Sequence, residues 1–169
     1  MKKKISLITA FCFQLLCITG FTQTVSVTPV ASQNKVIVTV DSKPFTEFIY
    51  PDSLEKPVLY PIYAADGEII TRGFPIVPRA NEPVDHPHHI GLWLNYENVN
   101  GLDFWNNSAA IPADKKPSYG WIKVTALGEV KSGTTGSLTY NANWQNIKKN
   151  ILLEEKQPSI LLLKIISAS

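Results

Sequence analysis

The sequence predicts an all-β protein, an antiparallel β-sandwich, and three observations lead to this prediction. From Thr24 onward, apolar residues recur at every second position far more often than at the helical period of about 3.6 residues. Turns that contain proline or glycine separate the apolar runs. The chain therefore contains about nine or ten short expected strands, a number that is typical of two packed sheets.

The first expected strands carry valines that alternate with polar residues, as in half-buried strands, and two runs of aromatic and β-branched residues follow them. In chain order these segments contain Val25 and Val27, then Val36, Val38 and Val40, then residues 45–50, then residues 58–63. Asp66-Gly67, directly after them, is typical of a hairpin turn.

The second half of the chain predicts further strands at residues 88–96, 121–130 and 137–144, with a turn at residues 132–136. Between the first two of these strands, residues 106–119 contain prolines and show no periodicity. We expect a long surface loop there, the kind of segment that often carries function. The last apolar run, residues 160–166, is expected to be either a final buried strand or the exposed edge of a truncated sheet.

The N-terminus predicts export from the cytoplasm. Three lysines follow Met1 and precede an apolar stretch from Ile5 to Phe21, which is the layout of a signal peptide. A spanning helix needs about 20 mostly apolar residues, and this stretch is shorter and interrupted. We therefore expect residues 1–22 to be a signal peptide and residues 23–169 to form one periplasmic or secreted domain without a membrane span, incomplete at its C-terminus.

Two other fates of this N-terminus remain open but are less favoured. One is an uncleaved membrane anchor. The other is a lipid anchor on Cys12 or Cys17, which Phe11 and Leu16 oppose because a small residue is expected before the cysteine. Both cysteines would leave with the signal peptide, so the mature domain would contain no disulfide.

The composition of the mature chain disfavours nucleic acid as a partner. Removal of residues 1–22 takes away three lysines and leaves thirteen basic and fourteen acidic residues, a net charge of −1. Proteins that bind nucleic acid usually carry a basic surface. The remaining 147 residues are enough for one domain with a real core.

All three histidines of the chain lie in one segment, Asp85-His86-Pro87-His88-His89. If this segment is extended, His86 and His88 project to one side, and Asp85 and His89 project to the other. His86 and His88 could then provide two ligands to a divalent metal such as zinc, with a carboxylate from elsewhere. Alternatively, one histidine acts as a general acid or base without metal, or the segment only shapes a turn.

Further candidate site residues surround the histidines. Asp103, flanked by apolar residues, is either a buried, paired carboxylate or a turn residue, and we take it with His86 and His88 as a catalytic candidate. Arginine forks suit carboxylate, phosphate or polyol ligands, and indole rings suit stacking on sugars, with a solvated surface and the core as the ordinary alternatives. The substrate-binding candidates are therefore Arg72, Arg79, His89, Trp93 and Trp105.

Four segments resemble the PmoA-like family, which is often labelled methane oxygenase. They are residues 56–63, 71–75, 85–93 and 100–105, within a similarity that covers residues 35–155. The Asp-His-Pro-His-His run followed by Ile-Gly-Leu-Trp is the most specific of them. Members of that family continue past the end of this chain, so the resemblance implies a C-terminally truncated member.

The resemblance implies a domain of unestablished function whose layout is similar to the large sandwiches of sugar mutarotases, an analogy of fold alone. The leading hypothesis is therefore an exported carbohydrate-active or carbohydrate-binding protein with a small-molecule ligand, such as a sugar, at a histidine-centred site. A metal-dependent oxygenase or hydrolase that uses His86 and His88 is the second hypothesis. A non-catalytic surface or binding module is the third.

Overall fold

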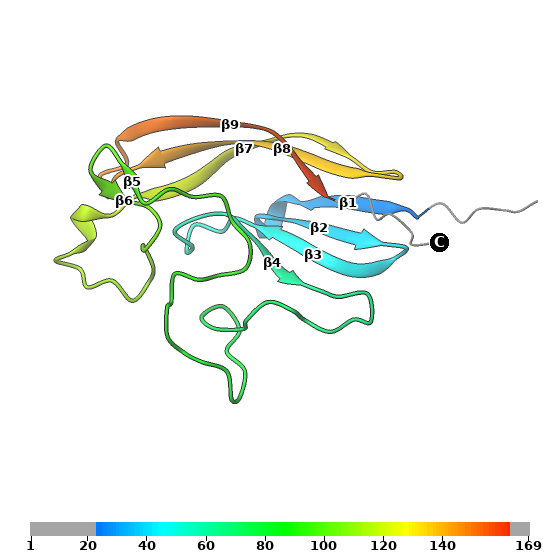
Figure 1. Ribbon diagram of the computed structural model, residues 1–169. Coiled ribbons are helices and arrows are strands. Elements are labelled where there is room, and N and C mark those ends of the chain that lie inside the picture. The colour runs from blue at the N-terminus through cyan, green and yellow to red at the C-terminus, as the bar shows by residue number, and fades with distance from the viewer. Residues whose placement is uncertain (1–22, 163–169) are drawn as a thin grey trace, which may run out of the picture.

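The computed structural model describes residues 23–162, and for residues 157–162 it describes the backbone alone. Two antiparallel sheets lie one above the other in Figure 1, which confirms the predicted all-β sandwich. One sheet has the strand order β1-β2-β3-β4, and the other has the order β7-β8-β9. The strands of the first sheet are β1 (Val25–Val30), β2 (Lys35–Val40), β3 (Lys43–Ile49) and β4 (Val58–Ile62). Those of the second are β7 (Trp121–Lys131), β8 (Gly136–Gln145) and β9 (Ile151–Leu162).

The core lies between the two sheets and follows the period-two pattern of the sequence. Val27 on β1 pairs with Val38 on β2, and both side chains are buried. On the facing sheet, alternate residues of β8 point inward, because successive side chains of a strand lie on opposite faces. These inward residues are Leu138, Tyr140, Ala142 and Trp144. The Tyr140 ring stacks on Phe48 of β3 at a centroid distance of 5.0 Å, which joins the two layers.

The β9 strand begins earlier than the sequence analysis expected, and it includes a proline. Its register with β8 shifts between Leu138 and Tyr140, the stretch that lies opposite Pro158. A proline cannot donate a ladder hydrogen bond and is tolerated at an irregularity of an edge strand. The expected strand at residues 160–166 is therefore, up to residue 162, the end of one longer strand. Residues 163–166 lie outside the described part of the chain.

The expected strand at residues 88–96 is wrong. This segment belongs to the long irregular connection between β4 and β5 (Asn98–Val99), and its one ladder contact is an isolated bridge between Leu92 and Leu59. His86 and Gly91 have positive φ angles of 47° and 53°, which interrupt the extended backbone. Pro87 between them offers no N–H to a neighbouring strand.

The turns around the histidine segment follow their sequence signatures. Asp66-Gly67 closes a turn in which the Gly67 N–H donates to the Ala64 carbonyl at 3.0 Å. Asn100 and Gly101, both with positive φ, join β5 to β6 (Leu102–Asp103) as the two-residue loop of a tight hairpin. This hairpin presents Asp103, Phe104 and Trp105.

The predicted loop at residues 106–119 is irregular apart from the short 3-10 helix η2 (Lys116–Ser118). Its first part is not at the surface, however. Asn107 is fully buried, and its Nδ2 donates to the Gly120 carbonyl at 2.7 Å. The other 3-10 helix, η1 (Ala31–Gln33), connects β1 to β2.

The predicted signal peptide, residues 1–22, lies outside the described residues. Within the part that the structure describes, no helix has the length and apolar character needed to cross a membrane.

Candidate functional site

The histidine segment is a tight turn that Arg72 holds in place. The Arg72 guanidinium donates from Nη1 to Asp85 Oδ1 at 2.9 Å and from Nη2 to the His86 carbonyl at 2.8 Å. Asp85 Oδ2 in turn lies 2.8 Å from His86 Nδ1. The His89 N–H donates to the His86 carbonyl at 2.9 Å, which closes the turn. Arg72 therefore clamps the backbone of the histidine turn, and its predicted role in ligand binding stays a prediction.

The turn brings the three imidazole rings into mutual contact. His88 and His89 meet edge to face at 4.3 Å between centroids, and His86 stacks on His89 at 5.1 Å. The expectation that His89 points away from His86 and His88 is therefore wrong, because it assumed an extended backbone that the positive φ of His86 abolishes. Among the residues that the structure describes, no group of three or more His, Cys, Asp or Glu side chains is arranged to hold a metal ion.

A buried lysine, Lys56, contacts both tryptophans, and its charge lowers the pKa of His88 and His89. Its side chain is 1% exposed, and its Nζ donates to the Trp105 carbonyl at 2.7 Å. The same ammonium lies 4.2 Å from the centroid of the Trp93 ring, a cation–π contact. Trp93 and Trp105 themselves pack edge to face at 4.5 Å. Burial lowers the pKa of Lys56 to about 8, against the opposing effect of the Glu55 and Asp103 carboxylates.

Asp103 is the turn residue that one of the two sequence interpretations expected. Its Oδ1 accepts the Asn106 N–H at 2.9 Å, and its Oδ2 accepts Asn106 Nδ2 at 2.7 Å. Its charge also reaches the site, since it raises the pKa of both Lys56 and His88. Asp103 therefore shapes the loop that carries Trp105 and adds a negative charge beside His88.

His88 is held in its neutral form by its surroundings. Its pKa is lowered chiefly by burial, and further by the positive charges of His89, Lys56 and His86, while Asp103 opposes the change. The pKa of His89 is lowered in the same way, by burial first and then by His86, Arg72 and Lys56. A neutral imidazole can accept a proton, so His88 has the state that a general base needs. We call His88, Lys56, Asp103, Trp93 and Trp105 the His88 site.

The lowered pKa of His88 predicts acid sensitivity. As the pH falls below about 6.5, the unfolded chain binds a proton at this position before the folded chain does, so the free energy of unfolding decreases. In His88→Gln this contribution is absent, and we expect a weaker loss of stability between pH 7 and pH 5. Urea denaturation of both proteins across this range tests the prediction. Equal pH dependence in the two proteins would contradict it.

The structure does not bring Arg79 to the His88 site. Arg79 Nη2 forms an ion pair with Glu82 Oε1 at 2.7 Å and also donates to the Thr71 carbonyl. Glu82 Oε2 accepts the Gly73 N–H at 2.7 Å. These bonds fold the connection after β4 back on itself, so the contacts of Arg79 are those of a structural residue.

A cavity of about 420 Å³ borders the histidine turn. Arg72, His89 and Gly91 line it together with Ile70 and Thr71. This volume lies within the range of about 300–1,000 Å³ that small-molecule sites occupy. Two predicted substrate-binding residues, Arg72 and His89, thus lie beside open space.

Sequence reasoning missed Lys56. It precedes Pro57 at the start of a strand, where a lysine is ordinarily solvated, and its burial arises only from the folding of distant loops over it. The sequence carries no separate signal for this. By contrast, Trp93 and Trp105 were predicted as a pair around the histidine cluster, and the structure places them in contact.

Comparison with known proteins corrects the sequence-based family assignment. The family model that matches residues 35–160 is described as a family of unknown function, DUF6807. The predicted resemblance to the PmoA-like family is therefore wrong, because the match is to DUF6807 and nothing supports the other family. No curated protein and no solved structure gives a significant match to the chain.

Proposed function

We propose that this chain, which belongs to the family of unknown function DUF6807, binds a sugar at the His88 site and uses His88 for proton transfer to or from a sugar hydroxyl. The observation that carries the proposal is that a half-buried imidazole with a lowered pKa and a partly exposed indole are both linked to the buried Lys56. Trp105 is 40% exposed, packs on Trp93, and is tied to Lys56, whose charge acts on His88.

Each part of the site has a chemical counterpart in a sugar. The exposed indole offers an apolar face to the C–H groups of a pyranose ring, and burial of such a face favours binding. The neutral imidazole accepts a hydroxyl proton, which is the first step when the anomers of a reducing sugar interconvert. Asp103 stabilises the imidazolium that this step would form, because it is the nearby negative charge that raises the pKa of His88.

We propose that the protein binds sugar outside the cytoplasm. The support for this location is the sequence of residues 1–22, in which a basic start precedes an interrupted apolar stretch. Periplasmic and secreted proteins meet free sugars and glycans there. The mass of the mature protein isolated from the producing cells tests this part, since loss of about the first 22 residues is expected.

Replacement of Trp105 by alanine is expected to weaken sugar binding by about tenfold or more, because the stacking surface is lost. The protein is first titrated with a panel of neutral and acidic monosaccharides and disaccharides by calorimetry. The sugar that binds is then used with the variant. Tyr96→Ala is the matched control, since Tyr96 is also an exposed aromatic residue, at 66%, and is not part of the His88 site. Equal losses in both variants, or no binding by any sugar, would contradict the proposal.

A further inference from the structure

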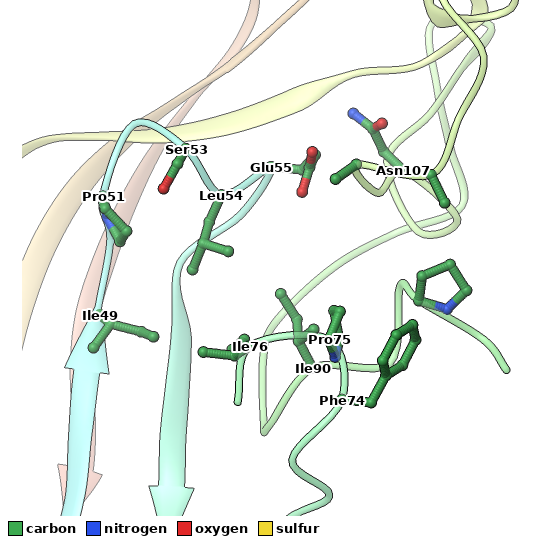
Figure 2. A pocket seen from close by; sticks show the side chains of 13 residues that line it. Ile49, Pro51, Ser53, Leu54, Glu55, Phe74, Pro75, Ile76, Ile90 and Asn107 are labelled. Carbon is green, nitrogen blue, oxygen red and sulfur yellow. The ribbon is translucent and has the colours of Figure 1, made fainter. Parts of the chain in front are cut away.

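A second and larger cavity has a different character from the cavity that Arg72 and His89 line. It encloses about 510 Å³, again within the range of ligand sites. Its walls are mostly apolar and come from the end of β3, the segment before β4, the long connection after β4 and residues 107–110 of the loop after β6 (Figure 2). The apolar side chains that define it include Ile49, Leu54, Phe74, Ile76 and Ile90.

Glu55 contributes a buried carboxylate to this apolar cavity. Its side chain is 8% exposed and lines the cavity. Figure 2 shows Glu55 and Asn107 at one end of the cavity and Ile76 and Ile90 at the other. A ligand that fills the cavity would therefore meet polar groups at one end and hydrocarbon at the other.

The Glu55 carboxylate has no hydrogen-bond donor and no ion-pair partner among residues 23–156, whose side chains the structure describes. The two lysines whose pKa it influences are engaged elsewhere. Lys56 Nζ donates to the Trp105 carbonyl, and Lys123 Nζ donates to the Asp52 and Leu54 carbonyls at 2.7 and 2.6 Å. A largely buried carboxylate on the wall of an apolar cavity, without a partner in the described part of the protein, favours a bound cation or hydrogen-bond donor.

Asn107 provides a second acceptor without a donor. Its side chain is fully buried and lines the same cavity. Its Nδ2 is bonded to the Gly120 carbonyl, whereas its Oδ1 has no partner. Buried polar atoms are nearly always hydrogen-bonded in folded proteins. This Oδ1 oxygen is inaccessible to solvent, so Asn107 contributes a polar wall beside Glu55, and the Glu55 carboxylate is the acceptor that a bound group would meet.

The position of Glu55 is fixed before any ligand arrives. Its carbonyl accepts the Ile122 N–H of β7 at 2.8 Å, which ties the segment before β4 to the opposite sheet. Lys123, the next residue of β7, holds the same segment through Asp52 and Leu54. The site is therefore preorganised, which lowers the entropic cost of binding.

We propose that this cavity binds an organic amine, with its ammonium group against the Glu55 carboxylate and its hydrocarbon or aromatic body against Phe74, Ile76 and Ile90. The ammonium supplies positive charge and hydrogen-bond donors to the Glu55 carboxylate, and the body buries apolar surface. This site is separate from the His88 site, and it goes beyond the proposed sugar chemistry.

The test compares three ligands with the same aromatic body by calorimetric titration of the protein: phenethylamine, 2-phenylethanol and 3-phenylpropionate. We expect phenethylamine to bind at least tenfold more tightly than the alcohol, and the acid to show no binding. Hexylamine is included as a second amine, with an aliphatic chain in place of the phenyl ring, so that the result does not depend on one apolar group. If neither amine binds, or if the alcohol binds as tightly as the amine, the proposal is overturned.

Variants locate the binding site. Glu55→Gln is expected to weaken phenethylamine binding at least tenfold, and Ile76→Trp, which fills the cavity, is expected to abolish it. Glu47→Gln is the matched control, because Glu47 is paired with Lys35 on the sheet and does not line the cavity. Unchanged amine affinity in Glu55→Gln would overturn the proposal. Sugar affinity should be the same in Ile76→Trp as in the parent, because Ile76 lines this cavity and is not part of the His88 site, so the failure of one proposal is distinguishable from the failure of the other.

Discussion

Replacing Phe104 with alanine is expected to lower the free energy of unfolding by about 3–5 kcal/mol. Phe104 is 1% exposed and packs on Trp144 of the facing sheet at 4.8 Å between ring centroids. Its ring also lies directly over Gly120, where a Cβ atom would come within 2.2 Å of it. Loss of this ring leaves a cavity that the neighbouring backbone is poorly placed to fill.

The same substitution is expected to weaken sugar binding, because Phe104 lies between Asp103 and Trp105 and anchors both. Urea denaturation measures the stability effect, and calorimetric titration with the bound sugar measures the second effect. Phe104→Leu keeps most of the buried volume and serves as the matched control, with a clearly smaller loss of stability. A loss below about 1 kcal/mol in Phe104→Ala would show that this ring does not hold the loop.

The substitution His88→Gln is expected to slow anomer interconversion of the bound sugar by a factor of about 10²–10⁴, the usual contribution of a general acid or base. Glutamine can replace a hydrogen bond of the imidazole but accepts no proton near neutral pH. Exchange spectroscopy by proton NMR, with the sugar at equilibrium between its anomers, measures the rate directly. Sugar affinity should change far less than the rate.

Two controls separate catalysis from folding in this experiment. The variant should show the same urea midpoint as the parent at pH 8, where the histidine is neutral in both the folded and the unfolded chain. Tyr96→Ala should keep the parent rate, since Tyr96 is exposed and lies outside the His88 site. A parent protein that binds the sugar but does not accelerate its anomer exchange would reduce the proposed function to binding alone.

The period-two pattern of the sequence was sufficient to predict the sandwich, because burial on one face of a strand leaves a direct trace in the sequence. The valines of β1 and β2 and the alternating apolar residues of β8 are buried as that pattern requires. The same pattern misled at residues 88–96. There Leu92, Leu94 and Tyr96 alternate correctly, yet they are 58–66% exposed. Alternation shows which side chains share a face, but a strand also needs a partner for its backbone.

The candidate site was predictable only where its residues are neighbours in the sequence. The three histidines are clustered in the chain and remain clustered in the structure. Their relative orientation was not predictable, because it depends on a positive φ at His86 that the Arg72 clamp stabilises. Lys56 and Glu55 could not be found at all, since the burial of a charged side chain is decided by loops that fold over it from elsewhere in the chain.

Arg72 and Arg79 also show that the sequence does not reveal which contacts a charged side chain makes in the folded protein. Both were predicted to bind a ligand, which stays a prediction, and both form ion pairs and bonds to backbone carbonyls that shape the connection after β4. Arg72 remains beside the histidines and the adjoining cavity, whereas Arg79 does not. Residue type alone does not distinguish an arginine that binds a ligand from one that holds a loop, because both use the same planar donors.

The most direct test of the His88 site is a chemical-shift map of the protein during titration with the sugar that binds. Assigned histidine C–H and tryptophan indole N–H signals are followed by two-dimensional NMR. Our account predicts that His88 and Trp105 shift first and in proportion to saturation, while Trp144, which is buried in the core, stays unchanged. Saturable sugar binding that leaves both His88 and Trp105 unperturbed would contradict the account and would place the functional site elsewhere on the sandwich.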